Sequence, residues 1–283
     1  MRLMIRIIVI LVLAMTTAVY SQFTDRELTQ RPTGESGRIA NDNYFYKPTN
    51  IINYPTASIL RGGDLSASLR MFEQGGVLGR LSVGISDRIM FGVSYGGLHI
   101  IGREQQIDWN SVPGIHFVYR LIEENLRYPA MVVGFDSQGY GPYFPEKKND
   151  PDYNENYPGR YYFKSRGFYC VVSKGYASLI SVGLHAGVSY SLEYSSESKK
   201  RAPTLFLATD MHLSRNLGIL FEYDFATDDP NKYPRGLLNT GFRWAFSPNM
   251  FFEFNFQNIL KSGTGESDVR RILRLTYHGN VLQ

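Results

Sequence analysis

Charged side chains of both signs recur at every second position in segments whose intervening positions are apolar. Because residues two apart on a strand share one face, these side chains line a single polar face. The basic members are Arg70, Arg80, Arg120, Arg243, Arg270 and Arg274. The others are Asp136, Glu193, Asp210, Glu222, Asp224, Glu253 and His185. Such groups can bind and orient small polar or charged solutes by electrostatics, which requires no cofactor.

The two signs fall on different parts of the chain. If the last predicted strand pairs with the first, the arginines gather on the terminal and first strands, and most acids gather on the middle ones. Opposed walls would set a transverse field across an opening. Small residues on the same face then leave a narrow polar channel: Gly92, Gly134, Gly183, Gly187 and Gly241. In the alternative, opposite charges pair and close the lumen, because an unpaired buried charge is costly.

The same face also carries serine and histidine residues of the types that hydrolases use. His185 shares its edge with Ser181 and Ser189, and His212 lies two positions from Asp210. The chain has no Gly-x-Ser-x-Gly turn of the kind that exposes a nucleophilic serine. A histidine among polar lumenal neighbours is more often structural, so the sequence predicts that the protein is not an enzyme.

Two polar segments suggest weaker sites. Asp150, Asp152 and Asn154 have the alternate spacing of oxygen ligands in a calcium loop, but the segment lacks the central glycine and the closing glutamate. It is a weak metal candidate, and the sequence predicts no metal site. Lys199, Lys200 and Arg201 lie in a predicted outer loop, where they would either meet lipopolysaccharide phosphates or be a solvated charge run.

The elements that position these residues are predicted strands. The stretch from Ile180 to Glu193 alternates apolar with small or polar residues throughout and has no helical period. Similar alternation recurs in residues 65–71, 80–85, 89–96, 115–121, 130–138, 161–174, 204–213, 217–226, 238–246, 251–258 and 269–277. About 12 strands result, most of them near the ~9 to 11 residues with which a tilted strand crosses a bilayer. In residues 161–174 the assignment of faces is ambiguous.

The connections give an independent test. Tight links at residues 86–88, 123–127, 174–178, 214–216 and 247–249 alternate with longer polar ones at 99–111, 139–160, 194–202, 227–236 and 261–267. Outer-membrane barrels have short periplasmic turns and longer extracellular loops, whereas a soluble β-sandwich does not require this alternation. The sequence therefore predicts an all-β, antiparallel, up-and-down transmembrane barrel in the outer membrane, with its apolar edge toward lipid.

The chain divides into three predicted segments. Arg2 and Arg6 flank a short apolar run, so residues 1–21 read as a cleaved signal peptide; a membrane-spanning helix would need roughly 20 apolar residues. Residues 22–63 have no sustained period and would lie in the periplasm, plug the lumen or form a flexible leader. Residues 64–283 form the barrel. The single cysteine, Cys170, excludes an internal disulfide.

Composition supports this class. The 283 residues include 20 Tyr, 18 Phe and 27 Gly, and only 20% are charged. The net charge of +4 falls to +2 without Arg2 and Arg6, and the basic residues are scattered. This balance argues against a nucleic-acid partner.

The stretch PTASILRGGDLSASLR, residues 55–70, runs into GGVLGRLSVGISDRIMFGVSYGG and is similar to the opening of YjbH-like outer-membrane barrels. That resemblance implies an association with exopolysaccharide production. The last predicted strand, VRRILRLTY, resembles the carboxy-terminal signal read by the barrel-assembly machinery, although HGNVLQ follows it.

Two functions remain open. The first is a narrow channel for passage or binding of small polar or charged solutes, without cofactor. The second is a non-conducting barrel that supports envelope or exopolysaccharide assembly. A barrel of ~8 strands is filled by side chains and one of 16 or more encloses a channel, so a count of about 12 decides neither. The oligomeric state is not predicted.

Overall fold

The computed structural model describes residues 47–102, 106–146, 149–152, 154–155, 159–177, 181–193, 201–263 and 268–280. These residues belong to one compact unit, Tyr46–Gln283. None of them forms a helix long and apolar enough to cross a membrane. The predicted signal peptide and residues 22–46 lie outside the described part of the chain.

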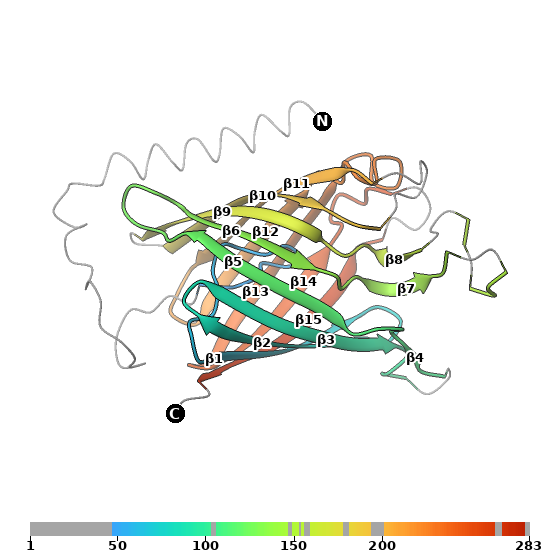
Figure 1. Ribbon diagram of the computed structural model, residues 1–283, viewed down its shortest axis with the longest axis horizontal. Coiled ribbons are helices and arrows are strands. Elements are labelled where there is room, and N and C mark those ends of the chain that lie inside the picture. Colours follow the sequence, from blue (N-terminus) through green and yellow to red (C-terminus); the bar gives the residue numbers. More distant parts are fainter. Residues whose placement is uncertain are drawn as a thin grey trace. The chain divides into compact units, whose positions relative to one another are not determined.

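Twelve strands close into one barrel (Figure 1). They are β1 (Asp64–Phe72), β2 (Gly76–Ser86), β3 (Ile89–Leu98), β5 (Gly114–Ile122), β6 (Ala130–Asp136), β9 (Gly167–Ala177), β10 (Ser181–Tyr190), β11 (Pro203–His212), β12 (Leu217–Asp224), β13 (Leu237–Ser247), β14 (Met250–Gln257) and β15 (Arg270–Asn280). Each strand lies beside the next one along the chain, and β15 returns to pair with β1 from Asp64↔Asn280 to Met71↔Leu273. The predicted fold class and strand count are therefore confirmed.

The strand pairs are antiparallel ladders except between β9 and β10. In the described residues these two neighbours share one register pair, Tyr190 with Gly167, of the parallel type. Gly167 has a φ of 62°, and a Cβ atom there would lie 2.1 Å from the carbonyl oxygen of Tyr190. Only glycine fits this close approach, which fixes the start of β9 against the end of β10.

Three short strands lie outside the ring. β4 (Asp108–Trp109) extends the edge of β3, and β7 (Tyr140–Phe144) pairs with β8 (Arg160–Phe163) in a separate hairpin. Two sequence predictions are corrected here. Residues 161–174 are not one strand, because β8 ends before residues 164–166 and β9 follows them. The predicted outer loop at 139–160 contains β7 and the first residue of β8.

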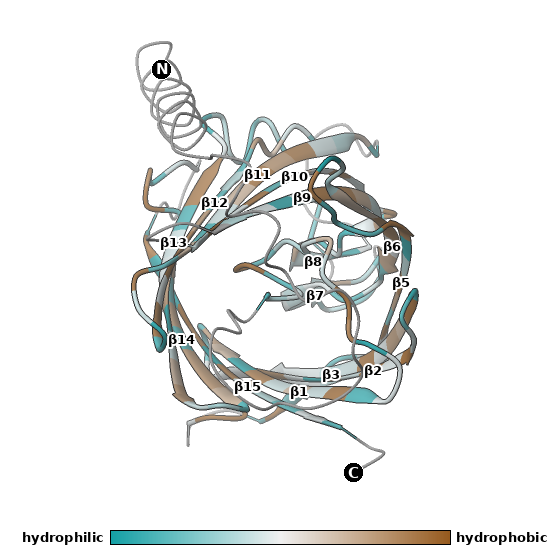
Figure 2. Ribbon diagram, turned by 90° about the vertical axis from the view of Figure 1, so that its left-hand side faces the viewer, coloured by the Kyte–Doolittle hydropathy of each residue, from teal (hydrophilic) through white to brown (hydrophobic). Residues whose placement is uncertain are grey.

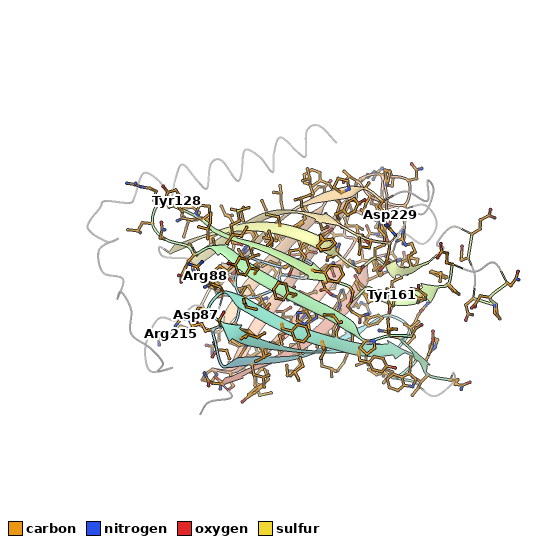
Figure 3. All side chains as sticks on the ribbon, viewed as in Figure 1. Asp87, Arg88, Tyr128, Tyr161, Arg215 and Asp229 are labelled. Atoms are coloured by element: carbon orange, nitrogen blue, oxygen red, sulfur yellow. The ribbon has the colours of Figure 1, made fainter. Side chains whose placement is uncertain are left out.

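The two ends of the barrel differ in their connections. Asp87, Arg88, Tyr128 and Arg215 mark the end with short turns, and Tyr161 and Asp229 lie at the opposite end with the long ones (Figure 3). One link at the long-loop end is itself tight: β1 and β2 are joined by residues 73–75, so the alternation is not strict there. The arrangement of short turns and longer loops otherwise confirms the prediction.

Alternating burial shows the two faces of the wall. In β11, Leu205 and Leu207 are 53% and 47% exposed, whereas Phe206 between them is 1% exposed. In the stretch that includes β10, Val188 is exposed and His185 is buried. Large apolar and aromatic side chains also face outward on β2, β3, β12 and β13, among them Leu81, Val93, Phe221, Phe242 and Trp244. A closed barrel with this exterior faces acyl chains, and the protein is an outer-membrane β-barrel.

Candidate functional site

The lumen contains a part of the protein itself. Residues 47–60, here called the lumenal segment, precede β1 and pass inside the ring, where Ile51, Ile52 and Tyr54 are fully buried. Its residues fold back in a tight loop: Ile51 N–H donates to the Tyr54 carbonyl at 2.9 Å, and Thr56 N–H donates to the Thr49 carbonyl at 3.0 Å. An Asn50–Pro55 bridge completes the loop. The buried N–H and carbonyl groups that this loop does not pair internally must find polar partners on the barrel wall.

Glu222 on β12 supplies the first set of partners. Its Oε2 accepts the backbone N–H groups of Ile52, Asn53 and Tyr54 at 3.1, 2.8 and 2.9 Å. Its Oε1 accepts Asn239 Nδ2 at 2.9 Å. Four donors therefore converge on a carboxylate that is 1% exposed. Hydrogen bonds to an ionised acceptor are roughly twice as strong as neutral ones, so Glu222 is the main anchor of the segment.

Arginines on β13, which is the neighbour of β12, and on β15 bind the carbonyl groups. Arg274 on β15 donates to the carbonyls of Ile51, at 3.0 Å, and Ile52. Arg243 on β13 donates to the Asn50 carbonyl at 3.2 Å. Glu253 lies between the two arginines, 2.7 Å from Arg243 and 3.0 Å from Arg274. The segment thus turns its carbonyls toward arginine and its N–H groups toward glutamate.

Apolar contacts complete the binding. Ile51 and Ile52 pack with Ala208 and Leu220 in one buried cluster. The ring of Tyr54 stacks on Phe206, with centroids 4.0 Å apart, and the Arg166 guanidinium lies 3.9 Å above the Tyr54 centroid. Sequence reasoning missed this apolar socket because it read the inward face as polar only. The signal was available, since Phe206, Ala208 and Leu220 share the parity of the charged residues.

A serine, a histidine and an aspartate form a chain beneath the segment. Ser173 Oγ lies 2.7 Å from His185 Nδ1, and His185 Nε2 lies 2.8 Å from Asp210 Oδ1. His212 Nε2 is 3.2 Å from the second oxygen of Asp210. The order resembles a hydrolase triad, but Ser173 Oγ accepts the Ala57 amide at 2.8 Å, and neither lumenal cavity described below is lined by it. In this structure the hydrogen bonds that run from Asp210 through His185 to Ser173 hold the lumenal segment at Ala57.

The β7–β8 hairpin reaches into the long-loop end of the lumen, and Figure 2 shows both strands within the outline of the ring. The Tyr140 hydroxyl lies 3.1 Å from Gln257 Oε1, and Arg70 lies 4.1 Å above the Tyr140 ring. Arg70 also donates to Asn53 Oδ1 at 2.6 Å. Glu193 accepts the amides of Tyr161 and Ser165 at 3.0 and 3.1 Å. The hairpin and the lumenal segment therefore share partners.

Buried ion pairs tie this hairpin to the loop between β12 and β13. Arg160 donates two hydrogen bonds of 2.9 Å to the two oxygens of Asp229, and Lys164 lies 2.6 Å from Asp228. Burial of Asp229 opposes its ionisation, but the hydrogen bonds from Arg160 and the charge of Lys164 outweigh burial and lower the pKa of Asp229. We call Arg160, Lys164, Asp228 and Asp229 the mouth cluster. None of the four was a sequence candidate.

The remaining predicted lumenal residues also have polar partners in the structure. Arg80 pairs with Asp136 at 2.7 Å, and Asp224 accepts Thr204 Oγ1 at 3.1 Å. Two arginines pair near the barrel ends, Arg270 with Glu73 at 2.9 Å and Arg120 with Glu123 at 3.8 Å. Opposite charges thus meet at several points, as in the closed alternative.

The weaker candidates lie in exposed segments or outside the described residues. Asp152 N–H donates to Asp150 Oδ1 at 3.1 Å in an exposed turn. In the described residues no group of three or more His, Cys, Asp or Glu side chains is placed to hold a metal, and Asn154 adds an amide only. Lys199 and Lys200 lie outside the described residues, whereas Arg201 is exposed.

Two cavities remain beside the lumenal segment. The larger, about 80 Å³, lies between residues 49–53 and the wall formed by β15, β1 and β2. The smaller, about 20 Å³, lies near His116 and Asp136. The segment and the hairpin thus occupy much of the lumen.

Comparison with known proteins gives no family. No family model matches the chain, and no curated protein matches it. Among solved structures it is similar to the KdgM porin, at 11% identity over 76% of this chain and 98% of that chain, with a TM-score of 0.44. The NanC porin matches at 9% identity over 77% and 98%, with a TM-score of 0.40. An outer membrane channel from Pseudomonas putida F1 matches at 13% identity over 83% and 100%, also with a TM-score of 0.40.

Proposed function

We propose that the protein is a narrow outer-membrane channel for small polar or charged solutes, and that the lumenal segment closes it. One observation carries the proposal: the segment is held by side chains of the wall rather than as an added strand of the sheet. Such contacts can be released without opening the barrel. Release would leave Glu222, Arg243 and Arg274 on a polar lumenal surface, which suits passage of hydrated solutes.

The burial of Ile51 and Ile52 favours a second candidate function. Both residues are fully buried against Ala208 and Leu220, and a fixed plug would bury them in the same way. The barrel would then be non-conducting and support envelope or exopolysaccharide assembly, the role implied by the resemblance to YjbH-like barrels. Lipopolysaccharide and the barrel-assembly machinery are the partners expected in either case.

A reversible crosslink separates these functions. Ala57 N and Ser173 Oγ are 2.8 Å apart, so the Ala57→Cys/Ser173→Cys pair, in a Cys170→Ala background, places two thiols within reach of a disulfide. In planar bilayers we expect no openings from the oxidised protein and stepwise currents after reduction. A non-reducing gel verifies the crosslink.

Each single cysteine variant, treated with the same oxidant, controls for loss of the Ser173 hydrogen bond. Equal currents before and after reduction would show that the segment does not close the channel. Silence of the refolded wild type and of every variant would favour the non-conducting barrel.

A further inference from the structure

The larger lumenal cavity carries an excess of positive charge. Its lining includes five basic side chains, Arg70, Arg80, Lys164, Arg166 and Arg274, and two acidic ones, Asp136 and Glu253. Both acids are already engaged: Asp136 pairs with Arg80, and Glu253 is shared by Arg243 and Arg274. The cavity therefore has guanidinium groups that these two carboxylates do not neutralise.

Two arginines in particular lack a carboxylate at hydrogen-bond distance within the described residues. Arg70 donates to the neutral amide oxygen of Asn53, and its buried Nε has no acceptor there. Arg166 stacks over Tyr54, and its one ion pair, with Asp224, is 3.8 Å long. Both side chains are half-buried, Arg70 has no ion pair in the described residues, and the single pair of Arg166 is long. A cation withdrawn from water without a close anion is costly, so this arrangement favours an added negative group.

The size of the cavity limits what that group can be. The cavity measures about 80 Å³ and one water needs ~10–15 Å³ of such space, so the cavity holds roughly five to eight water-sized groups. A carboxylate or a phosphate group is of this size, and both are planar or tetrahedral oxyanions that arginine binds through parallel hydrogen bonds.

We propose that Arg70 and Arg166 form a binding site for a small oxyanion, a carboxylate or a phosphate group carried by a solute. In the structure, Asn53 Oδ1 accepts a hydrogen bond from Arg70 that the oxyanion would accept instead. An anion that accepts this hydrogen bond from Arg70 removes one of the contacts that keep the lumenal segment in place. The effect on opening rests on the proposed channel function, whereas binding itself does not.

Binding is tested by ligand-dependent stability. The temperature at which the folded gel band disappears is measured in sodium phosphate, sodium acetate and sodium chloride at equal ionic strength. A ligand that binds only the folded protein raises this midpoint with the logarithm of its concentration. We expect phosphate or acetate to raise the midpoint above its value in chloride, and comparison of the two identifies the preferred oxyanion.

Variants assign the effect to the cavity. Arg70→Met is expected to need at least about tenfold more anion for the same rise in midpoint, because charge-assisted hydrogen bonds of ~1.5–3 kcal/mol are lost. Arg166→Met, should it fold, gives a second test. Arg215→Met, in an exposed turn, is the matched control and should behave as wild type. Shifts are compared within each variant, since Arg70 also contacts Tyr140.

Single-channel recordings in the same salts separate the two proposals. An oxyanion-dependent midpoint without any current would support the site and contradict the channel. Currents without an oxyanion-dependent midpoint would support the channel and overturn the site. Equal midpoints in all three salts, or identical shifts in wild type and Arg70→Met, would also overturn it.

Discussion

Replacing Glu222 with alanine is expected to raise the fraction of time for which the channel is open by at least about 100-fold. The substitution removes the acceptor of three backbone N–H groups of the lumenal segment. Leaving a buried donor without a partner costs ~1–3 kcal/mol, so three of them weaken the closed state by at least about 3 kcal/mol. The measurement is open probability in planar bilayers.

Two variants control this experiment. Glu222→Gln keeps one oxygen acceptor but loses the charge, and we expect an intermediate open probability. Glu123→Gln changes an exposed carboxylate in the β5–β6 turn and should leave the currents as in wild type. Equal open probabilities in Glu222→Ala and wild type would contradict the role given to Glu222.

The mouth cluster is expected to dominate the stability of the long-loop end. Arg160→Ala breaks a buried pair in which both partners are almost inaccessible to water, and breaking such a pair costs about 3–5 kcal/mol. We expect a clear fall in the midpoint of the heat-dependent gel shift. Replacing both partners with Arg160→Met/Asp229→Leu should recover most of the loss, because the charges of Arg160 and Asp229 are removed together and Lys164 keeps its pair with Asp228.

The same pair predicts an acid dependence. The pKa of Asp229 is lower in the folded protein than in the unfolded chain, so its stabilising effect is complete above the unfolded value of ~3.9 and is lost as the pH falls through the folded value. The difference in midpoint between wild type and Asp229→Asn should therefore be constant above about pH 5 and shrink below about pH 4. A difference that does not change with pH would contradict the assignment.

The barrel wall could be predicted from sequence because its rules are local. A period of two, maintained through residues such as Val188 and His185, fixes which side chains face lipid and which face the lumen. Turn lengths then give the order of strands. The error at residues 161–174 arose where the period breaks at Lys164, Ser165 and Arg166, between β8 and β9. These residues leave the wall and contact the lumen.

The content of the lumen could not be predicted in this way. Residues 47–60 have no period, and their partners are far along the chain: Glu222 is 170 residues from Ile52. No local rule links them. The pattern of charges along the strands indicated opposed arginine and acidic groups, but not that a backbone segment would lie between Arg274 and Glu222. The mouth cluster was missed for the same reason, since Arg160 and Asp229 lie in predicted loops.

The occupied lumen is tested most directly by thiol accessibility. In a Cys170→Ala background, Ile52→Cys is treated with a water-soluble maleimide in the folded state, beside Thr56→Cys as a second buried position and Arg215→Cys as an exposed one. We predict that positions 52 and 56 react far more slowly than position 215, and that Glu222→Ala speeds both. Reaction of positions 52 and 56 as fast as position 215 in the folded protein would show that the segment lies outside the lumen and would contradict the account.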